Sequence, residues 1–424
     1  MLSQRADLNV LFILIDTLRA DHLGSYGYER DTSPSLDWLA ATGVRFGRHH
    51  AQSSWTKCSM ASLWTGLYPV RSGVTRFDHV IPNEAKLPAE ILREAGFYTT
   101  GLYRNGWVDP SFGFAQGFNV YDRPVSRPPP PSVRRENPTV MAGGTDADTL
   151  EAAIEFLRIY GDERWFLYLH LMDVHEYVYD EDTAFFGTSY ADVYDNAIRR
   201  VALILDRLLG HLAHEGFLEK TLVVVASDHG EAFGERGREG HARFVYRETT
   251  EVPLILGFPF RLEPGVVLDV RTRNVDVWPT LLDLLGLPPL EEADGRSYLP
   301  EILAAVRGEP VRDDGAPSFA QLDQNWGQRD RKPAPTLAVT EAGYRYVMTP
   351  LPQGRTREEL FDGASDRLEL RNLIAEQPEV AERLRALARG YLESPPAPWG
   401  VDTPTLEMDE IQLNQLRALG YAVP

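Results

Sequence analysis

Two uninterrupted runs of apolar residues constrain the fold of this chain more than any other feature. Val10 to Ile15 is entirely apolar and is followed by Asp16, and Leu222 to Ala226 is followed after one serine by Asp228 and His229. Apolar runs of this length are typical of strands buried on both faces of a parallel sheet. Sites in open α/β sheets form at the carboxyl ends of such strands. The sequence therefore predicts a polar site where these two strands end.

Two further strand-like runs have the same form. Trp165 to Met172 leads to His175, and Tyr98 to Leu102 leads to Tyr103 and Asn105. Because parallel strands end at one edge of a sheet, we expect the polar side chains after all four runs to share that edge.

Segments between and after these runs show helical spacing of apolar residues. The strongest is Asp192 to Leu212, which has the form of a crossover helix. Further helices are expected at Val275 to Leu285, closed by Gly286, and at Pro378 to Tyr391.

The chain is long enough for more than one folding unit. It has 424 residues, of which 43% are hydrophobic. Residues 1–311 alternate between strand-like and helical segments, so we expect an α/β domain with a large, mostly parallel sheet between helices. From 312 to 424 the alternation stops, and the stretch Thr336 to Thr349 favours β-structure. There we expect a smaller α+β subdomain with antiparallel strands, a helix and a tail.

The charge balance limits the partners of the chain. There are 43 basic and 62 acidic residues, a formal charge of −19, which repels nucleic acid and anionic membrane surfaces at long range. Cys58 is the one cysteine, so no intramolecular disulfide can form. The polar N-terminus leads into an apolar run too short to span a bilayer and lacks a secretory pattern. We therefore expect a cytoplasmic protein.

Residues 54–66, Ser-Trp-Thr-Lys-Cys-Ser-Met-Ala-Ser-Leu-Trp-Thr-Gly, resemble the signature of the sulfatase family, which belongs to the alkaline phosphatase superfamily. That signature reads CxPSR, then a short spacer, then TG. Aligning the Thr-Gly pair and Ser59 places Thr56 where the family has the cysteine that becomes formylglycine. Placing Cys58 there would leave the spacing to the Thr-Gly pair two residues short. The resemblance therefore implies Thr56 as the nucleophile.

A short helix is expected to begin near Ser59. Its free backbone N–H groups and positive dipole end would favour an anionic ester beside Thr56. Lys57 would be a further contact to the substrate. The alternative is that Thr56 only caps this helix, as threonine often does.

The resemblance also implies a metal site. The sequence that Asp16 opens, Asp-Thr-Leu-Arg-Ala-Asp-His, is similar to the first metal-binding strand end of sulfatase-like enzymes, and Asp228 with His229 is similar to the second. Together with Thr56 they would hold one divalent cation. Oxygen ligands with one imidazole favour Mn²⁺ or Zn²⁺ over Ca²⁺ or Mg²⁺, which are also open. A second metal is an open alternative.

Two histidines and an arginine extend the candidate site. The stretch 170–176 is similar to the strand end that carries the family's Asp-Pro-His, and His175 is the candidate general acid because imidazole titrates near neutral pH. Its alternative is a structural, hydrogen-bonded histidine. In the loop before Val-Pro-Leu, His241 would contact substrate or metal, and Arg243 would bind an anionic oxygen or be a surface charge only.

Tyr103 and Asn105 stand where many sulfatases have a lysine and a histidine, and Met60 stands in place of the signature arginine. These departures are more similar to phosphonate monoester hydrolases, although Tyr103 and Asn105 can still donate hydrogen bonds to a bound ester. The resemblance continues to a C-terminal tail, Gln415 to Tyr421, and so covers nearly the whole chain.

These observations predict a metal-dependent hydrolase of phosphate or phosphonate esters that acts through a covalent intermediate on Thr56. A phosphodiester or phosphonate monoester is favoured, because a threonine cannot expel sulfate as formylglycine can. The alternatives are a sulfatase, a phosphoryl transferase and a non-catalytic sulfatase-like binding protein.

The expected partner is a small anionic ester. Association into a homo-oligomer is also considered, with the proline-rich loop Pro128 to Pro131 and the tail as candidate contacts.

Overall fold

The computed structural model describes residues 5, 7–125, 144–180, 183, 186–396, 399–410, 413–414 and 417. The proline-rich loop expected at Pro128 to Pro131 and all but one residue of the tail Gln415 to Tyr421 lie outside the described residues. Among the described helices, none combines the length and apolar character needed to cross a membrane.

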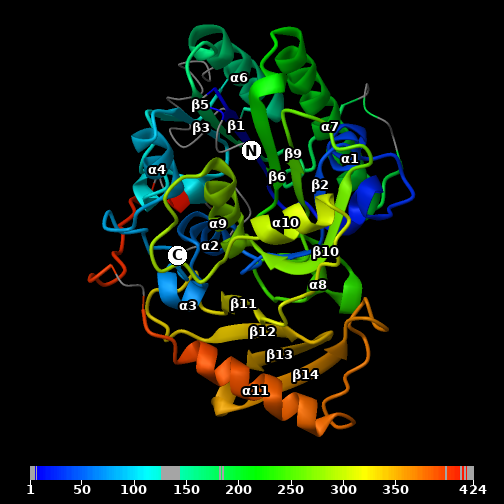
Figure 1. The fold of residues 1–424 in the computed structure, drawn as a ribbon. Coiled ribbons are helices and arrows are strands. Elements are labelled where there is room, and N and C mark those ends of the chain that lie inside the picture. Colours follow the sequence, from blue (N-terminus) through cyan, green and yellow to red (C-terminus); the bar gives the residue numbers. More distant parts are fainter. Residues whose placement is uncertain are drawn as a thin grey trace.

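A sheet of eight strands forms the centre of the molecule (Figure 1). Its order is β10-β2-β9-β6-β1-β5-β3-β4, and every neighbouring pair is parallel except those that involve β9. The strands are β1 (Asn9–Ile15), β2 (Val44–His50), β3 (Tyr98–Tyr103), β4 (Val120–Asp122), β5 (Trp165–Leu171), β6 (Thr221–Ala226), β9 (Leu254–Gly257) and β10 (Val266–Arg273).

The four apolar runs of the sequence are the four adjacent strands β6, β1, β5 and β3. β1, β5 and β6 are buried along their whole length, which explains their lack of alternation. In register, Leu14 lies opposite Ala226 of β6, and Ile15 lies opposite Leu171 of β5. The residues that follow these strands therefore emerge at one edge, as predicted.

Helices cover both faces of this sheet. One apolar core contains residues of α1 (Pro34–Ala41), α6 (Asp146–Tyr160) and α7 (Tyr190–His214). The other contains residues of α2 (Thr56–Thr65), α4 (Pro88–Glu94), α9 (Asn274–Leu285) and α10 (Leu299–Val306). The predicted crossover helix is α7. The second predicted helix is α9, and its C-cap Gly286 has a φ of 68°, which glycine adopts without strain.

Short elements complete the main unit. They are α3 (Pro69–Ser72), α8 (Arg247–Thr250), the two-stranded ribbon of β7 (Ala232–Phe233) and β8 (Glu239–Gly240), and the 3₁₀ turns η2 (Ala20–His22), η3 (Gly24–Tyr26), η4 (Gly106–Val108), η5 (Pro110–Phe112), η6 (Leu218–Lys220) and η7 (Glu235–Gly237).

Helix α2 begins earlier than the sequence suggests. It starts at Thr56 rather than near Ser59, because the extended backbone of Trp55, with φ −135° and ψ 128°, immediately precedes it. The Trp55 ring stacks on Trp326, with centroids 4.5 Å apart. Thr56 is therefore the first helical residue, and its side chain does not cap the helix. Every residue of α2 is buried.

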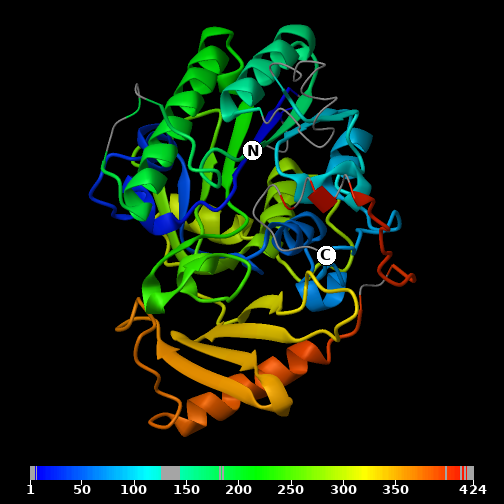
Figure 2. The same ribbon diagram turned by 180° about the vertical axis from the view of Figure 1, so that it is seen from behind.

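A second, antiparallel sheet lies below the main sheet in Figure 1 and is covered by α11 (Pro378–Leu392), as Figure 2 shows from behind. The stretch expected as β-structure, Thr336 to Thr349, is a hairpin of two strands. The strands, in sheet order, are β11 (Ser318–Asp323), β12 (Pro335–Glu341), β13 (Tyr344–Pro350) and β14 (Thr356–Asp362), with η8 (Pro352–Gly354) between the last two. Apolar residues of β12, β13, β14 and α11 form a third core together with Tyr68 and Val275 of the main unit.

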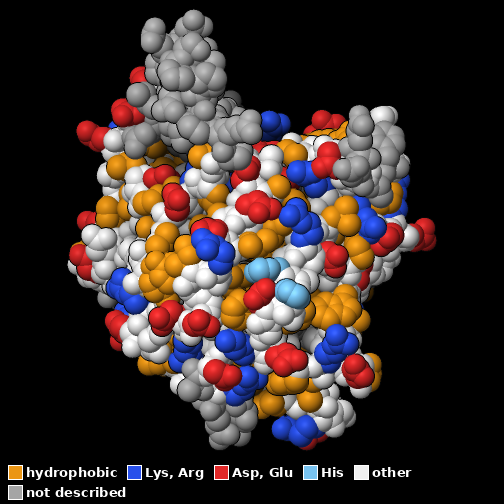
Figure 3. Space-filling model, turned by 90° about the horizontal axis from the view of Figure 1, so that it is seen from above, with side chains coloured by type: hydrophobic (Ala, Val, Ile, Leu, Met, Phe, Trp, Pro, Cys, Tyr) orange, Lys and Arg blue, Asp and Glu red, His pale blue; other side chains and the backbone are white. Residues whose placement is uncertain are grey.

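Acidic and basic side chains alternate over the face seen in Figure 3. The large negative charge is therefore not gathered into one patch on that face.

Candidate active site

Asp16, Asp228 and His229 meet at the carboxyl edge of the main sheet, where β1 and β6 end. Their ligand atoms lie within 4.8 Å of one another, and all three side chains are fully buried. The His229 Nε2 atom is 3.4 Å from Asp228 Oδ2 and 3.8 Å from Asp16 Oδ1. The structure thus brings together the three predicted metal ligands from strand ends more than 200 positions apart.

Thr56 joins this set from the N-terminus of α2. Its Oγ1 is 3.1 Å from His229 Nε2, and the Asn105 amide donates to it at 3.3 Å. The same Asn105 Nδ2 donates to Asp16 Oδ2 at 2.6 Å. We call Asp16, Thr56, Asp228 and His229 the Thr56 group; Asn105 orients two of its members.

The donor atoms of the Thr56 group fit a divalent cation. Asp16 Oδ1 and Asp228 Oδ2 are buried and have no hydrogen-bond partner among the described residues. Leaving two carboxylate oxygens unpaired in a buried site is costly unless a cation compensates them. His229 Nδ1 lies 3.0 Å from the Gly230 carbonyl, which leaves the Nε2 lone pair available as a ligand. Two carboxylate oxygens, one imidazole nitrogen and one hydroxyl therefore lie close together.

The remaining carboxylate oxygens are held in place. Asp228 Oδ1 accepts from the backbone N–H of Thr17 at 3.3 Å and of His229 at 2.9 Å. Thr17 has a φ of 60°, an unfavourable value for a β-branched residue, and this turn directs its N–H toward Asp228.

His170 supports Asp16 from within β5. Its Nε2 lies 3.0 Å from Asp16 Oδ2, and its Nδ1 lies 2.7 Å from the Tyr168 hydroxyl. All three side chains are fully buried. Sequence reasoning assigned no role to His170, although a histidine inside an otherwise apolar strand was a usable signal.

His175 and His241 lie beside the Thr56 group. The His241 ring is 4.6 Å from the His229 ring and 5.0 Å from the His175 ring, centroid to centroid. His241 Nδ1 pairs with Glu231 Oε2 at 3.1 Å. Burial lowers the pKa of His241, but the Glu231 carboxylate and its acidic neighbours outweigh burial and raise it overall. The pKa of His175 is lowered, chiefly by burial. The sequence pointed to no role for Glu231.

The structure does not bring Lys57 to this group. Its ammonium donates to the Phe77 carbonyl at 2.6 Å and lies 3.5 Å from the centroid of the Phe112 ring, fully buried. The Tyr103 hydroxyl is likewise engaged, because it donates to Asp109 at 3.0 Å. These two side chains therefore contact their own neighbours rather than the Thr56 group.

Cys58 lies in the apolar core and does not belong to the described metal-ligating cluster. Burial raises the pKa of its thiol to about 12. Arg243, in contrast, is exposed, and within the described residues its guanidinium has no hydrogen bond or ion pair. It is available to bind an anion from solution.

Comparison with known proteins places this arrangement in a family. The family profile described as sulfatase matches residues 8–287, and the profile of the C-terminal region of N-sulphoglucosamine sulphohydrolase matches residues 234–391. The N-acetylgalactosamine-6-sulfatase of Rattus norvegicus is 28% identical over 70% of this chain, and the chain spans 66% of that protein's length. The choline-sulfatase of Rhizobium meliloti is 26% identical over 87% of this chain and 83% of its own.

Solved structures share the fold. The phosphonate monoester hydrolase of Agrobacterium radiobacter superposes with a TM-score of 0.69 at 20% identity, covering 91% of this chain and 95% of that one. A 2-O GAG sulfatase superposes with a TM-score of 0.72 at 19% identity, covering 91% and 92%. At these levels of identity, both similarities show a shared fold. Since the sulfatase profile spans most of the chain and includes every member of the Thr56 group, this protein belongs to the sulfatase family of the alkaline phosphatase superfamily.

Proposed function

We propose that this protein is a metal-dependent hydrolase of phosphate or phosphonate esters that uses Thr56 as its nucleophile. The observation that carries the proposal is the position of the Thr56 hydroxyl, 3.1 Å from His229 Nε2 in a group with two unpaired buried carboxylate oxygens. The one cysteine of the chain, which would be the precursor of a formylglycine, lies in the apolar core instead. Phosphodiesters and phosphonate monoesters are the favoured substrates.

A divalent ion held by the Thr56 group, with Mn²⁺ or Zn²⁺ favoured, would lower the pKa of the threonine hydroxyl and polarise a non-bridging oxygen of the ester. In the first step Thr56 Oγ1 bonds to phosphorus, and the bond from phosphorus to the leaving oxygen breaks. In the second step a water oxygen bonds to phosphorus, and the bond to Oγ1 breaks, which restores the hydroxyl. In each displacement the attacking oxygen, of Thr56 or of water, gives up a proton to a base, and the departing oxygen takes up a proton from an acid.

The two histidines beside the group would carry these protons. His175 was the candidate from sequence, and His241 is the nearer of the two to His229 among the ring pairs described. The Glu231 carboxylate favours the protonated form of His241, which suits it to donate to a leaving oxygen. Arg243, exposed and without a described partner, would contact an anionic oxygen of the substrate.

A second candidate function is sulfuric ester hydrolysis. The named curated relatives favour it, because they are sulfatases. The threonine at position 56 argues against it, because threonine cannot form the aldehyde hydrate through which formylglycine expels sulfate. The two candidates therefore predict different substrates for the same site.

The deciding experiment is an activity panel on purified, metal-reconstituted protein. Matched aryl phosphate monoester, phosphodiester, phosphonate and sulfate substrates are compared, with Thr56→Ala and Cys58→Ser alongside. We expect turnover of the phosphorus esters, a loss of at least ~100-fold in kcat/KM for Thr56→Ala, and retained activity for Cys58→Ser. Preferred turnover of the sulfate ester together with an inactive Cys58→Ser would overturn the proposal and establish an unusual sulfatase.

A further inference from the structure

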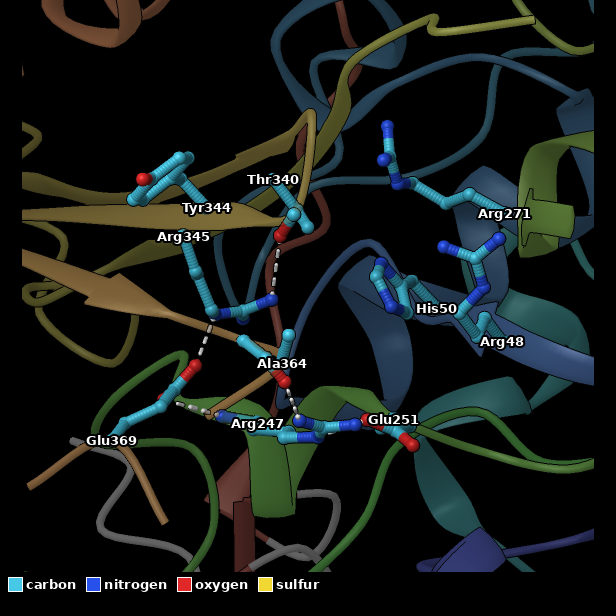
Figure 4. A pocket seen from close by; sticks show the side chains of 12 residues that line it. Arg48, His50, Arg247, Glu251, Arg271, Thr340, Tyr344, Arg345, Ala364 and Glu369 are labelled. Atoms are coloured by element: carbon cyan, nitrogen blue, oxygen red, sulfur yellow. Dashed lines mark hydrogen bonds and ion pairs between the residues drawn. The ribbon is translucent and has the colours of Figure 1, made fainter. Parts of the chain in front are cut away.

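A cavity of about 200 Å³ lies where the edge of the main sheet meets the C-terminal sheet (Figure 4). Its walls come from β2, α8 and β10 on one side and from β12, β13 and the segment after β14 on the other. None of its lining residues belongs to the Thr56 group or to the histidines beside it.

The wall of this cavity is rich in arginine. Arg48, Arg247, Arg271 and Arg345 line it, against two acids, Glu251 and Glu369. These six residues alone carry a formal charge of four minus two, or +2, in a chain whose net charge is −19.

The imidazole of His50 also lines the cavity, and the positive charge of the arginines affects its pKa. Burial, followed by Arg345, Arg271 and Arg247, holds its pKa well below the ordinary value. Its Nδ1 has no hydrogen-bond partner among the described residues.

Arg345 and Glu369 form the frame of the cavity. The Arg345 Nε is 3.2 Å from Glu369 Oε1, and its other nitrogens donate to Thr340 Oγ1 and to the Val245 carbonyl. These contacts hold the Arg345 guanidinium against the protein, so we treat it as a source of positive charge rather than as a direct donor to a ligand.

Three other arginines keep N–H groups without a partner in the described part of the chain. Arg48 donates through Nε and Nη2 to Asp269, which leaves Nη1. Arg247 donates through Nε to Glu251 and through Nη1 to the Gly363 carbonyl, which leaves Nη2.

Arg271 donates through Nη1 to the Ala316 carbonyl, which leaves its Nε. The Asp313 carboxylate offsets part of the positive charge of these arginines, because it lies 3.3 Å from Arg48 Nη2 and 3.9 Å from Arg271 Nη2. In Figure 4 the side chains of Arg48, His50 and Arg271 lie on one side of the cavity, and Arg247 and Arg345 reach toward it from the other elements.

We propose that this cavity binds a small tetrahedral oxyanion, phosphate or sulfate, between the two sheets and independently of the Thr56 group. Three separate elements bring to this cavity arginines with N–H groups that have no partner in the described part of the chain, and the charge-assisted hydrogen bonds of guanidinium to an oxyanion are strong. The volume lies below the ~300–1,000 Å³ typical of pockets for larger organic ligands, which favours a small ion. Because elements of both sheets line the cavity, bound anion stabilises their contact.

The test uses the metal-loaded, full-length protein. Crystals soaked in selenate, whose selenium scatters anomalously, give the position of the anion directly, and titration calorimetry with sodium phosphate and sodium sulfate at fixed ionic strength tells which is preferred. The variant is Arg48→Gln, whose side chain is 42% exposed and so can be changed without opening the core. Arg45→Gln on the same strand is the matched control, because its guanidinium lies over the Tyr26 ring instead.

We expect an anomalous peak among Arg48, Arg247 and Arg271, and an affinity at that site about 10-fold or more weaker in Arg48→Gln, with Arg45→Gln unchanged. Anomalous density confined to the Thr56 group would overturn the proposal. The absence of any anomalous peak in this cavity would also overturn it, and equal affinities of Arg48→Gln and the wild type would exclude the contact assigned to Arg48.

Discussion

Two buried acidic clusters lie at the carboxyl edge of the main sheet, and they differ in the source of their positive charge. In the Thr56 group, Asp16 and Asp228 each keep one oxygen without a hydrogen-bond partner among the described residues. In the second cluster, which we call the Arg104 cluster, Asp146 and Asp173 are compensated by Arg104 and Arg200.

The Arg104 cluster satisfies its own charges. Arg104 Nη1 is 2.8 Å from Asp146 Oδ1 and 2.6 Å from Asp173 Oδ1, and Arg200 Nε is 3.1 Å from Asp173 Oδ2. The remaining Asp146 oxygen accepts from the Asp173 backbone N–H at 2.9 Å. No oxygen of its two aspartates is therefore left for an external cation.

Neighbouring strand ends that both carry buried aspartates therefore differ in whether arginine side chains compensate the negative charge. A buried carboxylate pair compensated by arginine is a structural feature, whereas one that lacks such a cation can take one from solution. The Thr56 group is of the second kind.

The largest effect is expected for Arg104→Leu. The substitution leaves Asp146 and Asp173 buried with less compensating charge, so we expect the free energy of unfolding to fall by about 3–5 kcal/mol. Urea denaturation measures it. Arg158→Leu, which breaks the exposed pair with Glu155, is the control and should cost about 0–1 kcal/mol. Equal losses in the two variants would show that the Arg104 cluster is not structural.

Addition of a divalent cation is expected to stabilise the Thr56 group. Addition of Mn²⁺ or Zn²⁺ to chelator-treated protein should raise Tm, with about 2.7 kcal/mol of stabilisation when the free metal is 100 times its Kd. Calorimetric scans of wild type and Asp228→Asn measure this, and the variant should respond far less. A wild-type Tm that is indifferent to metal would contradict the assignment of the site.

Neutralising one acid should have opposite consequences in the two clusters. In chelator-treated protein, Asp228→Asn removes one of two like charges, so we expect stability to change by no more than about 1 kcal/mol or to rise. Asp173→Asn leaves Arg104 and Arg200 with less compensating negative charge, so it should lower the free energy of unfolding clearly. Urea denaturation curves of both variants measure the free energy of unfolding. A large loss of stability in metal-free Asp228→Asn would mean that the Asp228 carboxylate is already compensated in the protein.

The smallest effect is expected at Lys57. Its ammonium contacts Phe77 and Phe112 rather than the Thr56 group, so Lys57→Met should leave kcat and KM within about 2-fold. Arg243→Gln, at an exposed guanidinium, should instead raise KM if it contacts the substrate. Steady-state kinetics on the preferred ester compare the two, and a rise in KM for Lys57→Met alone would restore it as a substrate contact.

Much of the fold was predictable because buried parallel strands have a simple pattern. β1 and β6 are apolar throughout and end in polar residues, so both the sheet and the edge carrying Asp16 and Asp228 follow from sequence. The antiparallel β9 was not predictable, because a four-residue apolar segment carries no sign of direction. Strands β11 and β14 were missed because many of their residues are polar, and because their pairing depends on tertiary contacts.

Side-chain direction was the harder part of the site. The start of α2 three residues early decides where Thr56, Lys57 and Cys58 point, and it depends on the packing of Trp55 against a ring some 270 positions away in sequence, Trp326. The supporting role of His170 depends on register between β5 and β1, which a single sequence does not specify.

The most direct test of the central claim is mass spectrometry of metal-loaded protein quenched during turnover of an aryl phosphodiester or phosphonate. We expect a phosphorus adduct on the peptide that contains Thr56, located on its hydroxyl and absent from Thr56→Ala. No adduct on Thr56 under conditions of rapid turnover, together with an oxidised Cys58 in the form of formylglycine, would contradict it.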